Sequence, residues 1–133
     1  MIDIENELFT RVRNAVKTEY PNALIKGEYD PSPASFPCIT VIESENNVAR
    51  DKVTSTTAKF AYITYTINVY SNKTNGKHAE CRAIMKIIDS EMQSMGFLRT
   101  FLNPVPNIND ATIYRLTARY RAIVSEDGVT YLY

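Results

Sequence analysis

The side chains of this chain that could do chemistry are few and widely spaced. There is one histidine, His78, and there are two cysteines, Cys38 and Cys81. A zinc site uses closely spaced Cys and His ligands, and a catalytic histidine needs a nucleophile or carboxylate that converges on it. These positions offer neither arrangement. We therefore expect no metal site and a histidine that is exposed to solvent.

Carboxylates are a second possible source of chemistry. Glu43 and Glu45 flank Ser44 at the end of an expected strand, and Asp110 stands just before another. A metal-dependent nuclease gathers several carboxylates and a lysine around its metal ions. No Glu-x-Lys or Asp-x-Lys follows here on a neighbouring strand. We interpret these carboxylates as charges at the edges of loops.

The glycines give no sign of a phosphate or acyl-transfer site. The four glycines are Gly27, Gly76, Gly96 and Gly128. A phosphate cradle needs clustered glycines at a strand-to-helix turn, and the Gly-x-Ser-x-Gly elbow of serine hydrolases does not occur. Turns and helix ends account for each glycine, and Gly96 is placed to be a left-handed helix cap. The sequence predicts a protein that is not an enzyme and uses no cofactor.

The overall composition disfavours several classes of partner. Fifteen Lys and Arg balance fifteen Asp and Glu, so no net field draws the molecule to nucleic acid or anionic lipid. The longest apolar runs fall well short of the ~20 residues that cross a bilayer, and the acidic N-terminus does not read as a signal peptide. We expect one domain over residues 1–133, no membrane contact, and two buried, reduced cysteines; a disulfide is the alternative.

Hydrophobic periodicity predicts the elements that position these side chains. Four prolines mark residues 20–37 as an ordered connector or edge segment. The expected helices are 3–19 and 76–95, and the expected strands are 38–43, 58–71, 98–102, 111–125 and 129–133. Short turns imply an antiparallel β-sheet of about five strands in two hairpin groups. With the two main helices packed on one face, the fold class is α+β.

The expected strand 111–125 carries the most distinctive polar pattern. Alternation puts one set on a single face: Ile113, Arg115, Thr117, Arg119, Arg121 and Ile123. Three interpretations remain open, namely a face exposed to water, ion pairs between subunits that use the planar fork of arginine, and contact with a nucleic-acid backbone. A sheet that reads RNA would also show aromatic residues there. Isoleucines beside an arginine stripe are typical of a protein contact.

Two further features indicate a docking surface. The polar segment 44–57, which includes Asn46, Asn47 and Arg50, is an expected exposed loop that either becomes ordered on a partner or remains a plain surface loop. In strand 58–71 the set that includes Tyr62 faces water or a partner, while the alternate set faces the core. Asn46, Asn47, Arg50 and Tyr62 therefore join the arginine face as candidate interface residues.

The C-terminal half of the chain resembles a known family. The residues that carry the resemblance are Gly96-Phe97-Leu98-Arg99-Thr100-Phe101, Asn103-Pro104-Val105-Pro106-Asn107, Asp110, Ile113-Tyr114-Arg115-Leu116 and Ala118-Arg119-Tyr120-Arg121-Ala122. This stretch is similar to the small tail-terminator or tail-completion proteins of long-tailed phages, often called minor capsid proteins in prophages. The earlier layout is similar too, with an opening helix, a Pro-rich connector ending at Phe36-Pro37 and a strand ending at Glu43.

The resemblance implies a structural virion protein, made in the bacterial host cytoplasm and resident in the virion tail. Such a subunit forms a homohexameric ring at the head-proximal end of the tail tube, stops tube polymerisation and serves head–tail joining. Its implied partners are copies of itself, the tail-tube protein and head–tail connector proteins. Genome DNA passes through such a ring without specific binding. The residues alone leave an alternative, a small nucleic-acid-binding module that uses the Arg115, Arg119 and Arg121 face.

Overall fold

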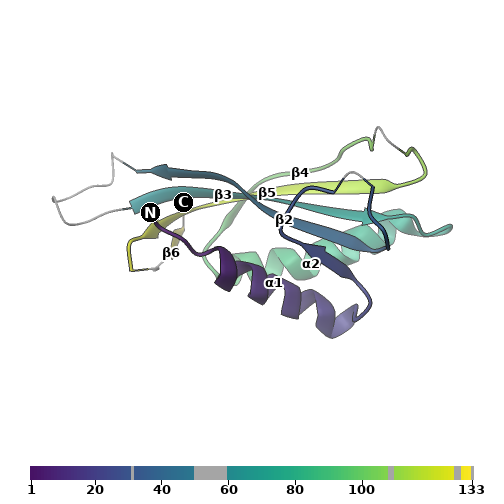
Figure 1. The fold of residues 1–133 in the computed structure, drawn as a ribbon, viewed down its shortest axis with the longest axis horizontal. Helices are drawn as coiled ribbons and strands as arrows, with labels where there is room; N and C mark the ends of the chain where they lie inside the picture. The colour runs from purple at the N-terminus through teal and green to yellow at the C-terminus, as the bar shows by residue number, and fades with distance from the viewer. Residues whose placement is uncertain (31, 50–59, 108–109, 128–129, 133) are drawn as a thin grey trace.

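The protein is a layer of two helices packed under one side of a twisted sheet (Figure 1). The computed structural model describes residues 1–30, 32–49, 60–107, 110–127 and 130–132, the last of these as backbone. The helices are α1 (Glu5–Glu19) and α2 (Lys77–Ser94), and the strands are β1 (Leu24–Lys26), β2 (Cys38–Val48), β3 (Phe60–Ser71), β4 (Leu98–Pro104), β5 (Tyr114–Ser125) and β6 (Thr130–Leu132).

The sheet is mostly antiparallel. Its strands follow the order β1-β2-β3-β5-β4, and β6 pairs with β5 beyond the end of β4. The longest pairing joins β3 to β5, from Phe60 opposite Ser125 to Ser71 opposite Tyr114. Only β1 and β2 run parallel to each other. The predicted α+β class, with an antiparallel sheet and both helices on one face, is confirmed.

Two parts of the sheet differ from the prediction. β1 lies inside the segment that we expected to be a connector or edge segment, and it adds a parallel edge strand of three residues. β2 runs to Val48, although we expected the strand to end at Glu43 and a loop to begin at Ser44. A bulge between Glu43 and Glu45 lets the polar half of β2 keep pairing with β3. Residues 50–57 of the expected loop, and residues 58 and 59 of the expected strand after it, lie outside the described residues.

The core lies between the sheet and the helices. α1 buries Leu8, Val12 and Val16, and α2 buries Cys81, Ile84, Met85, Ile88 and Met92. These residues recur at helical spacing, so each helix presents one apolar stripe to the alternate residues of β3 and β5. Met85 and Met92 are among the buried residues of α2 and fill the core. Among the described residues, no helix combines the length and the apolar character needed to span a membrane.

The end of α2 is fixed by Gly96. This residue has φ 87°, in the left-handed region. Its N–H donates to the Gln93 carbonyl at 2.9 Å, and the Phe97 N–H donates to the Met92 carbonyl at 3.0 Å. These two bonds are the Schellman pattern, which satisfies carbonyls that the helix leaves without partners. The predicted left-handed cap is confirmed, and it turns the chain directly into β4.

Candidate interaction surface

The side of the sheet that faces away from the helices, here called the outer face, carries the arginine ladder. β3 and β5 alternate, so every second residue of each strand points to this face. In the register, Arg115 lies opposite Tyr70 and Arg121 lies opposite Thr64. The ladder therefore runs along the sheet from one end to the other, and its two ends have different surroundings.

Asn68 joins three strands at one end of the outer face. Its Oδ1 accepts hydrogen bonds from Arg115 Nε at 3.0 Å and from Thr117 Oγ1 at 2.7 Å. Its Nδ2 donates to Thr40 Oγ1, on β2, at 3.1 Å. Asn68 is 1% exposed and Thr117 is 3% exposed. A buried amide whose hydrogen bonds are satisfied stabilises the subunit itself. Thr117 belongs to this hydrogen-bond network, which we call the Asn68 joint, and is therefore not available to a partner.

The connector between β1 and β2 covers this same end. The Arg115 guanidinium carbon lies 5.7 Å from the ring centroid of Tyr29, a connector residue, and 5.8 Å from that of Tyr70. Ile113, just before β5, is 9% exposed and packs in a small cluster with Cys38 and Tyr70. The structure thus places Ile113 and Thr117 inside the subunit and Arg115 partly buried beneath the connector.

The other end of the outer face brings together residues of β3, β4 and β5. Arg119 is exposed, and its guanidinium carbon lies 4.8 Å from the ring centroid of Phe101 on β4. The Arg121 guanidinium carbon lies 4.6 Å from the ring centroid of Tyr62 on β3. Leu98 on β4, opposite Arg121, is 42% exposed. We call Tyr62, Leu98, Phe101, Arg119 and Arg121 the arginine–aromatic surface.

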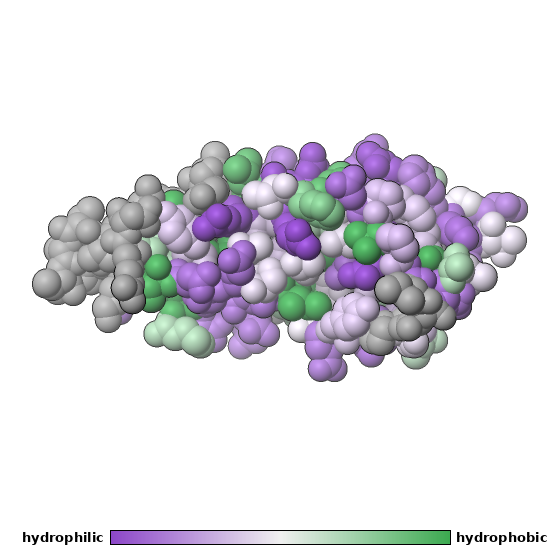
Figure 2. All heavy atoms as spheres, turned by 90° about the horizontal axis from the view of Figure 1, so that it is seen from above, coloured by the Kyte–Doolittle hydropathy of each residue, from purple (hydrophilic) through white to green (hydrophobic). Residues whose placement is uncertain are grey.

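Cation–π contacts hold these arginines in place. A guanidinium over an aromatic ring is stabilised by ~0.5–1 kcal/mol at an exposed site. The exposed Arg119 keeps its hydrogen-bonding edge available to a partner. Figure 2, which looks onto the outer face, shows hydrophobic side chains scattered among hydrophilic ones. Ile123, half-buried opposite Tyr62, lies beside this surface. The mixture is typical of a surface that contacts another protein.

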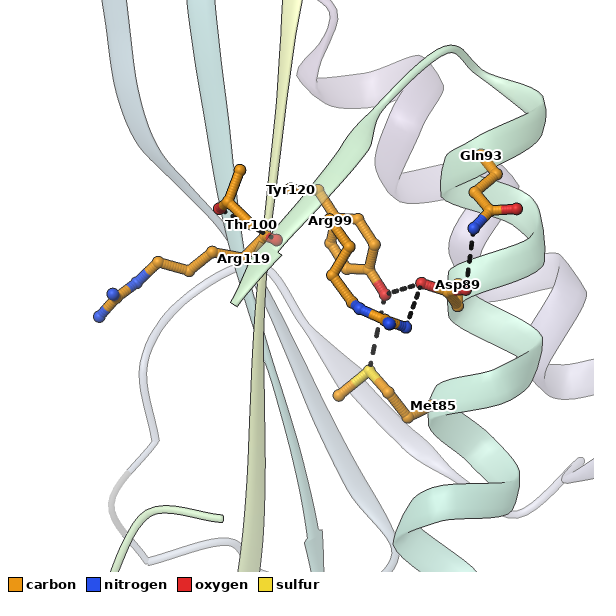
Figure 3. A network of polar contacts seen from close by, with 7 residues as sticks. All are labelled: Met85, Asp89, Gln93, Arg99, Thr100, Arg119 and Tyr120. Carbon is orange, nitrogen blue, oxygen red and sulfur yellow. Dashed lines mark hydrogen bonds and ion pairs between the residues drawn. The ribbon is translucent and has the colours of Figure 1, made fainter. Parts of the chain in front are cut away.

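The opposite side of β5 and β4 faces α2 and is tied to it. Tyr120 Oη donates to Asp89 Oδ1 at 2.9 Å, and Arg99 Nη1 lies 3.1 Å from the same oxygen. Figure 3 shows Arg99 reaching toward α2 while Arg119 extends away from it. Burial, followed by the Asp89 hydrogen bond, raises the pKa of Tyr120 well above its ordinary value. The two arginines therefore have different roles, although one strand pair positions both.

A second charged surface lies at the β2 edge, on the helix side. Asp3 Oδ1 accepts a hydrogen bond from the Glu5 N–H at 3.1 Å, just ahead of α1. Burial raises the pKa of Glu43, and the charges of Glu5 and Asp3 raise it further. These carboxylates therefore lie close enough to repel one another. We call Asp3, Glu5 and Glu43 the acidic corner.

A half-buried amide and a buried hydroxyl border the acidic corner. Asn46 Nδ2 donates to the Ile2 carbonyl at 2.7 Å and to Glu43 Oε1 at 3.3 Å, which ties the start of the chain to β2. The Tyr65 hydroxyl is buried, and no described residue hydrogen-bonds to it. Its pKa is raised by burial first and then by Glu43. The corner is therefore a concentration of negative charge beside a buried hydroxyl.

Other predicted site residues are dispersed. Asn47 is exposed and donates to Glu45 Oε2 at 3.5 Å, and Arg50 lies outside the described residues. His78 is exposed, with its ring centroid 5.2 Å from that of Tyr114. Glu43 pairs with inward-facing Tyr65, whereas Glu45 pairs with outward-facing Thr64, so these two carboxylates point to opposite sides of β2.

The cysteines take no part in either surface. Cys38 and Cys81 are both buried and free, as predicted, so the disulfide alternative is wrong. Burial raises the pKa of the Cys38 thiol to about 11 and that of Cys81 to about 12. Such thiols are poor nucleophiles. In the described part of the chain, no three or more His, Cys, Asp or Glu residues are arranged to hold a metal ion.

Sequence reasoning missed the aromatic partners of the arginines. Phe101 and Tyr62 belong to strands on either side of β5, and only the register brings them next to Arg119 and Arg121. It also missed Asn68, which looks like an ordinary outward polar residue. An asparagine in an apolar strand with a strict period of two was the available signal, because a strand disfavours this residue without a partner.

The fold has a match among solved structures. The chain superposes on a chain from the virion of a native gene transfer agent particle with a TM-score of 0.63, covering 89% of this chain and 91% of that one. This chain shares its fold with a component of a virion. The two sequences are 13% identical, so the likeness is one of fold. No family model matches the chain, and no curated protein matches it.

Proposed function

We propose that the protein is a structural component of a phage-like virion. The observation that carries this proposal is the fold shared, nearly end to end, with a chain of a gene transfer agent virion, over 89% of this chain and 91% of that one. More finely, we propose a tail-terminator or tail-completion role at the head-proximal end of the tail. The resemblance of residues 96–122 to phage tail terminators supports that finer role.

The surfaces described above suit such a role. A protein that assembles acts through complementary surfaces, and a closed ring of identical copies needs two different surfaces that match. The arginine–aromatic surface and the acidic corner are two such surfaces of opposite charge. In this role the subunit forms a ring, as a hexamer when assembled, and contacts the tail-tube protein and head–tail connector proteins. It works in the virion tail and requires neither catalysis nor a cofactor.

Electron microscopy of the protein mixed with its tail-tube protein tests the proposal. We expect sixfold rings, or short tubes capped at one end, at concentrations where the tube protein alone makes long tubes. Tubes that grow unchecked in the presence of an excess of this protein would contradict the role. A tail-tube gene immediately beside this one would support it independently.

A second candidate function has one observation in its favour. The outer face carries aromatic residues beside Arg119 and Arg121, which is a combination that single-stranded nucleic acids bind by stacking and charge. A nucleic-acid-binding module would bind DNA or RNA with an affinity that falls steeply with salt. The double variant Arg119→Ala/Arg121→Ala would weaken that binding. No binding of a ~20-nucleotide single strand at low salt would eliminate this candidate.

A further inference from the structure

We propose that the acidic corner of one copy docks on the arginine–aromatic surface of the next copy, and that this contact builds the ring. The inference rests on the proposed function and deepens it, because it names the two surfaces that join. The occupant of the arginine–aromatic surface is a second copy of this chain.

The positions of the two surfaces in the sheet carry the first step. In the strand order, β2 lies toward one edge and β4 forms the other. Glu43 is on β2, and Phe101, under Arg119, is on β4. Glu43 and the Arg119–Phe101 pair lie on strands that are not neighbours, so they do not meet within one subunit. They can meet between neighbours, which is the geometry of a head-to-tail contact.

The register carries the second step. Glu43 pairs with Tyr65, and Tyr65 pairs with Tyr120, the residue next to Arg119. The acidic corner and Arg119 therefore lie at the same level along the strands. A neighbour placed sideways, without a shift along the strands, aligns them. A head-to-tail contact of this kind closes into a ring where the rotation from one copy to the next closes.

The side on which each surface lies carries the third step. Glu43 faces the helix side of the sheet, and Arg119 faces the outer side. Neighbouring copies must therefore overlap partly, so that the helix-side edge of one copy contacts the outer face of the next. The start of α1, with exposed Asp3 and Glu5, lies at that edge and would be the contacting part.

Charge completes the argument. Among the described residues, no carboxylate lies within ion-pair distance of Arg119, and Phe101 holds its guanidinium in place. At the acidic corner, burial and then the charges of Glu5 and Asp3 raise the pKa of Glu43, so these carboxylates repel one another. A guanidinium from a neighbour would relieve that repulsion and form charge-assisted hydrogen bonds. Exposed Leu98 beside Arg121 supplies an apolar part to the same contact.

The experiment uses charge reversal at two exposed positions, Arg119→Glu and Glu5→Arg. Matched controls are Arg13→Glu and Glu19→Arg, which reverse the same charges at exposed sites on α1 away from both surfaces. Rings and capped tubes are counted by electron microscopy, and pairwise association is measured by sedimentation. Circular dichroism melting of every variant checks that the fold is intact.

Each reversal alone should abolish rings and capped tubes and weaken pairwise association by more than ~10-fold, because like charges then meet across the contact. Arg119→Glu/Glu5→Arg in one chain should restore both. An equimolar mixture of the two single variants should also associate, because each variant matches the other on both sides. The controls should assemble like the original protein.

Three outcomes separate the inference from the proposed function. If the charge-reversed proteins assemble normally while the original protein caps tubes, the inference is overturned and the function stands. If the original protein never caps tubes yet the reversal and rescue pattern holds in sedimentation, the function fails and the contact stands. If neither reversal weakens pairwise association and no tubes are capped, both are wrong.

Discussion

The helix side and the outer side of β5 receive the same alternation of residues but different cover. On the helix side Leu116, Ala118, Tyr120, Ala122 and Val124 are all buried against the helices. On the outer side Thr117 is buried within a polar joint, while Arg119, two residues further on, is exposed. The strand pattern decides which residues share a side. The elements that cover that side decide whether these residues are buried and stabilise the subunit, or are exposed and available to another molecule.

The largest expected difference between the two sides is in β3. Ile67 is fully buried on the helix side, and its neighbour Thr66 is half-buried on the outer side, where it donates to Ser44 Oγ at 3.0 Å. We expect Ile67→Ala to lower the free energy of unfolding by ~2–5 kcal/mol. Thr66→Ala should change it by only about 0.5 kcal/mol. Urea unfolding of both variants measures the two changes in the free energy of unfolding. Equal decreases would show that the two sides of β3 contribute equally to stability.

The hydrogen bond from Tyr120 to Asp89 should matter nearly as much. Tyr120→Phe keeps the ring in the core but leaves Asp89 without its 2.9 Å donor. A hydrogen bond to a charged group contributes ~1.5–3 kcal/mol, so a loss in this range is expected in thermal or urea unfolding. Tyr29→Phe, at a tyrosine that is 55% exposed in the connector between β1 and β2, is the matched control and should cost clearly less.

A smaller effect is expected at the turn that joins α2 to β4. Gly96→Ala places a side chain at φ 87°, which costs ~1–2 kcal/mol for an L-residue. Gly27→Ala is the control, since its new Cβ would lie 3.9 Å from the Phe9 ring, an ordinary contact, and its φ is not positive. The control should leave unfolding unchanged or slightly stabilise the protein. Equal effects would show that the left-handed cap is unimportant.

The smallest predicted effect concerns the acidic corner. The pKa of Glu43 is raised in the folded protein, so its contribution to stability is present at low pH and is lost as pH rises through the raised pKa. In Glu43→Gln the side chain does not ionise, so the variant does not lose this stability as pH rises. The stability of the variant relative to the original protein should therefore increase between about pH 4 and about pH 7. A difference that is flat across this range, measured by unfolding at each pH, would contradict the raised pKa of Glu43.

The sequence predicted the elements with strong periods well. α2 was expected over 76–95 and spans Lys77–Ser94, because its apolar stripe is regular and glycines mark both ends. β1 was missed as a strand because three residues show no period. The polar half of β2 was taken for a loop, since composition does not reveal that β3 continues to pair with it.

The candidate surface was predicted only in part. Alternation correctly grouped Arg115, Arg119 and Arg121 on one side of β5. It gave no sign that the connector would cover Arg115 and leave Arg119 open. The acidic corner depends on Glu43 meeting the start of α1, and that proximity is a product of the tertiary fold. An alternation with a period of two predicts the side of the sheet on which a residue lies. It does not predict which residues, remote in the sequence, contact it.

The Asn68 joint also limits how the strands can be misaligned. Its hydrogen bonds connect Thr40, Asn68 and Thr117 on three adjacent strands at a single level. A slip of any one strand by one residue would turn its polar member toward the helices and leave buried donors and acceptors unsatisfied. The amide thus fixes the register near one end of the outer face, and it selects one alignment of β2, β3 and β5 over the alternatives.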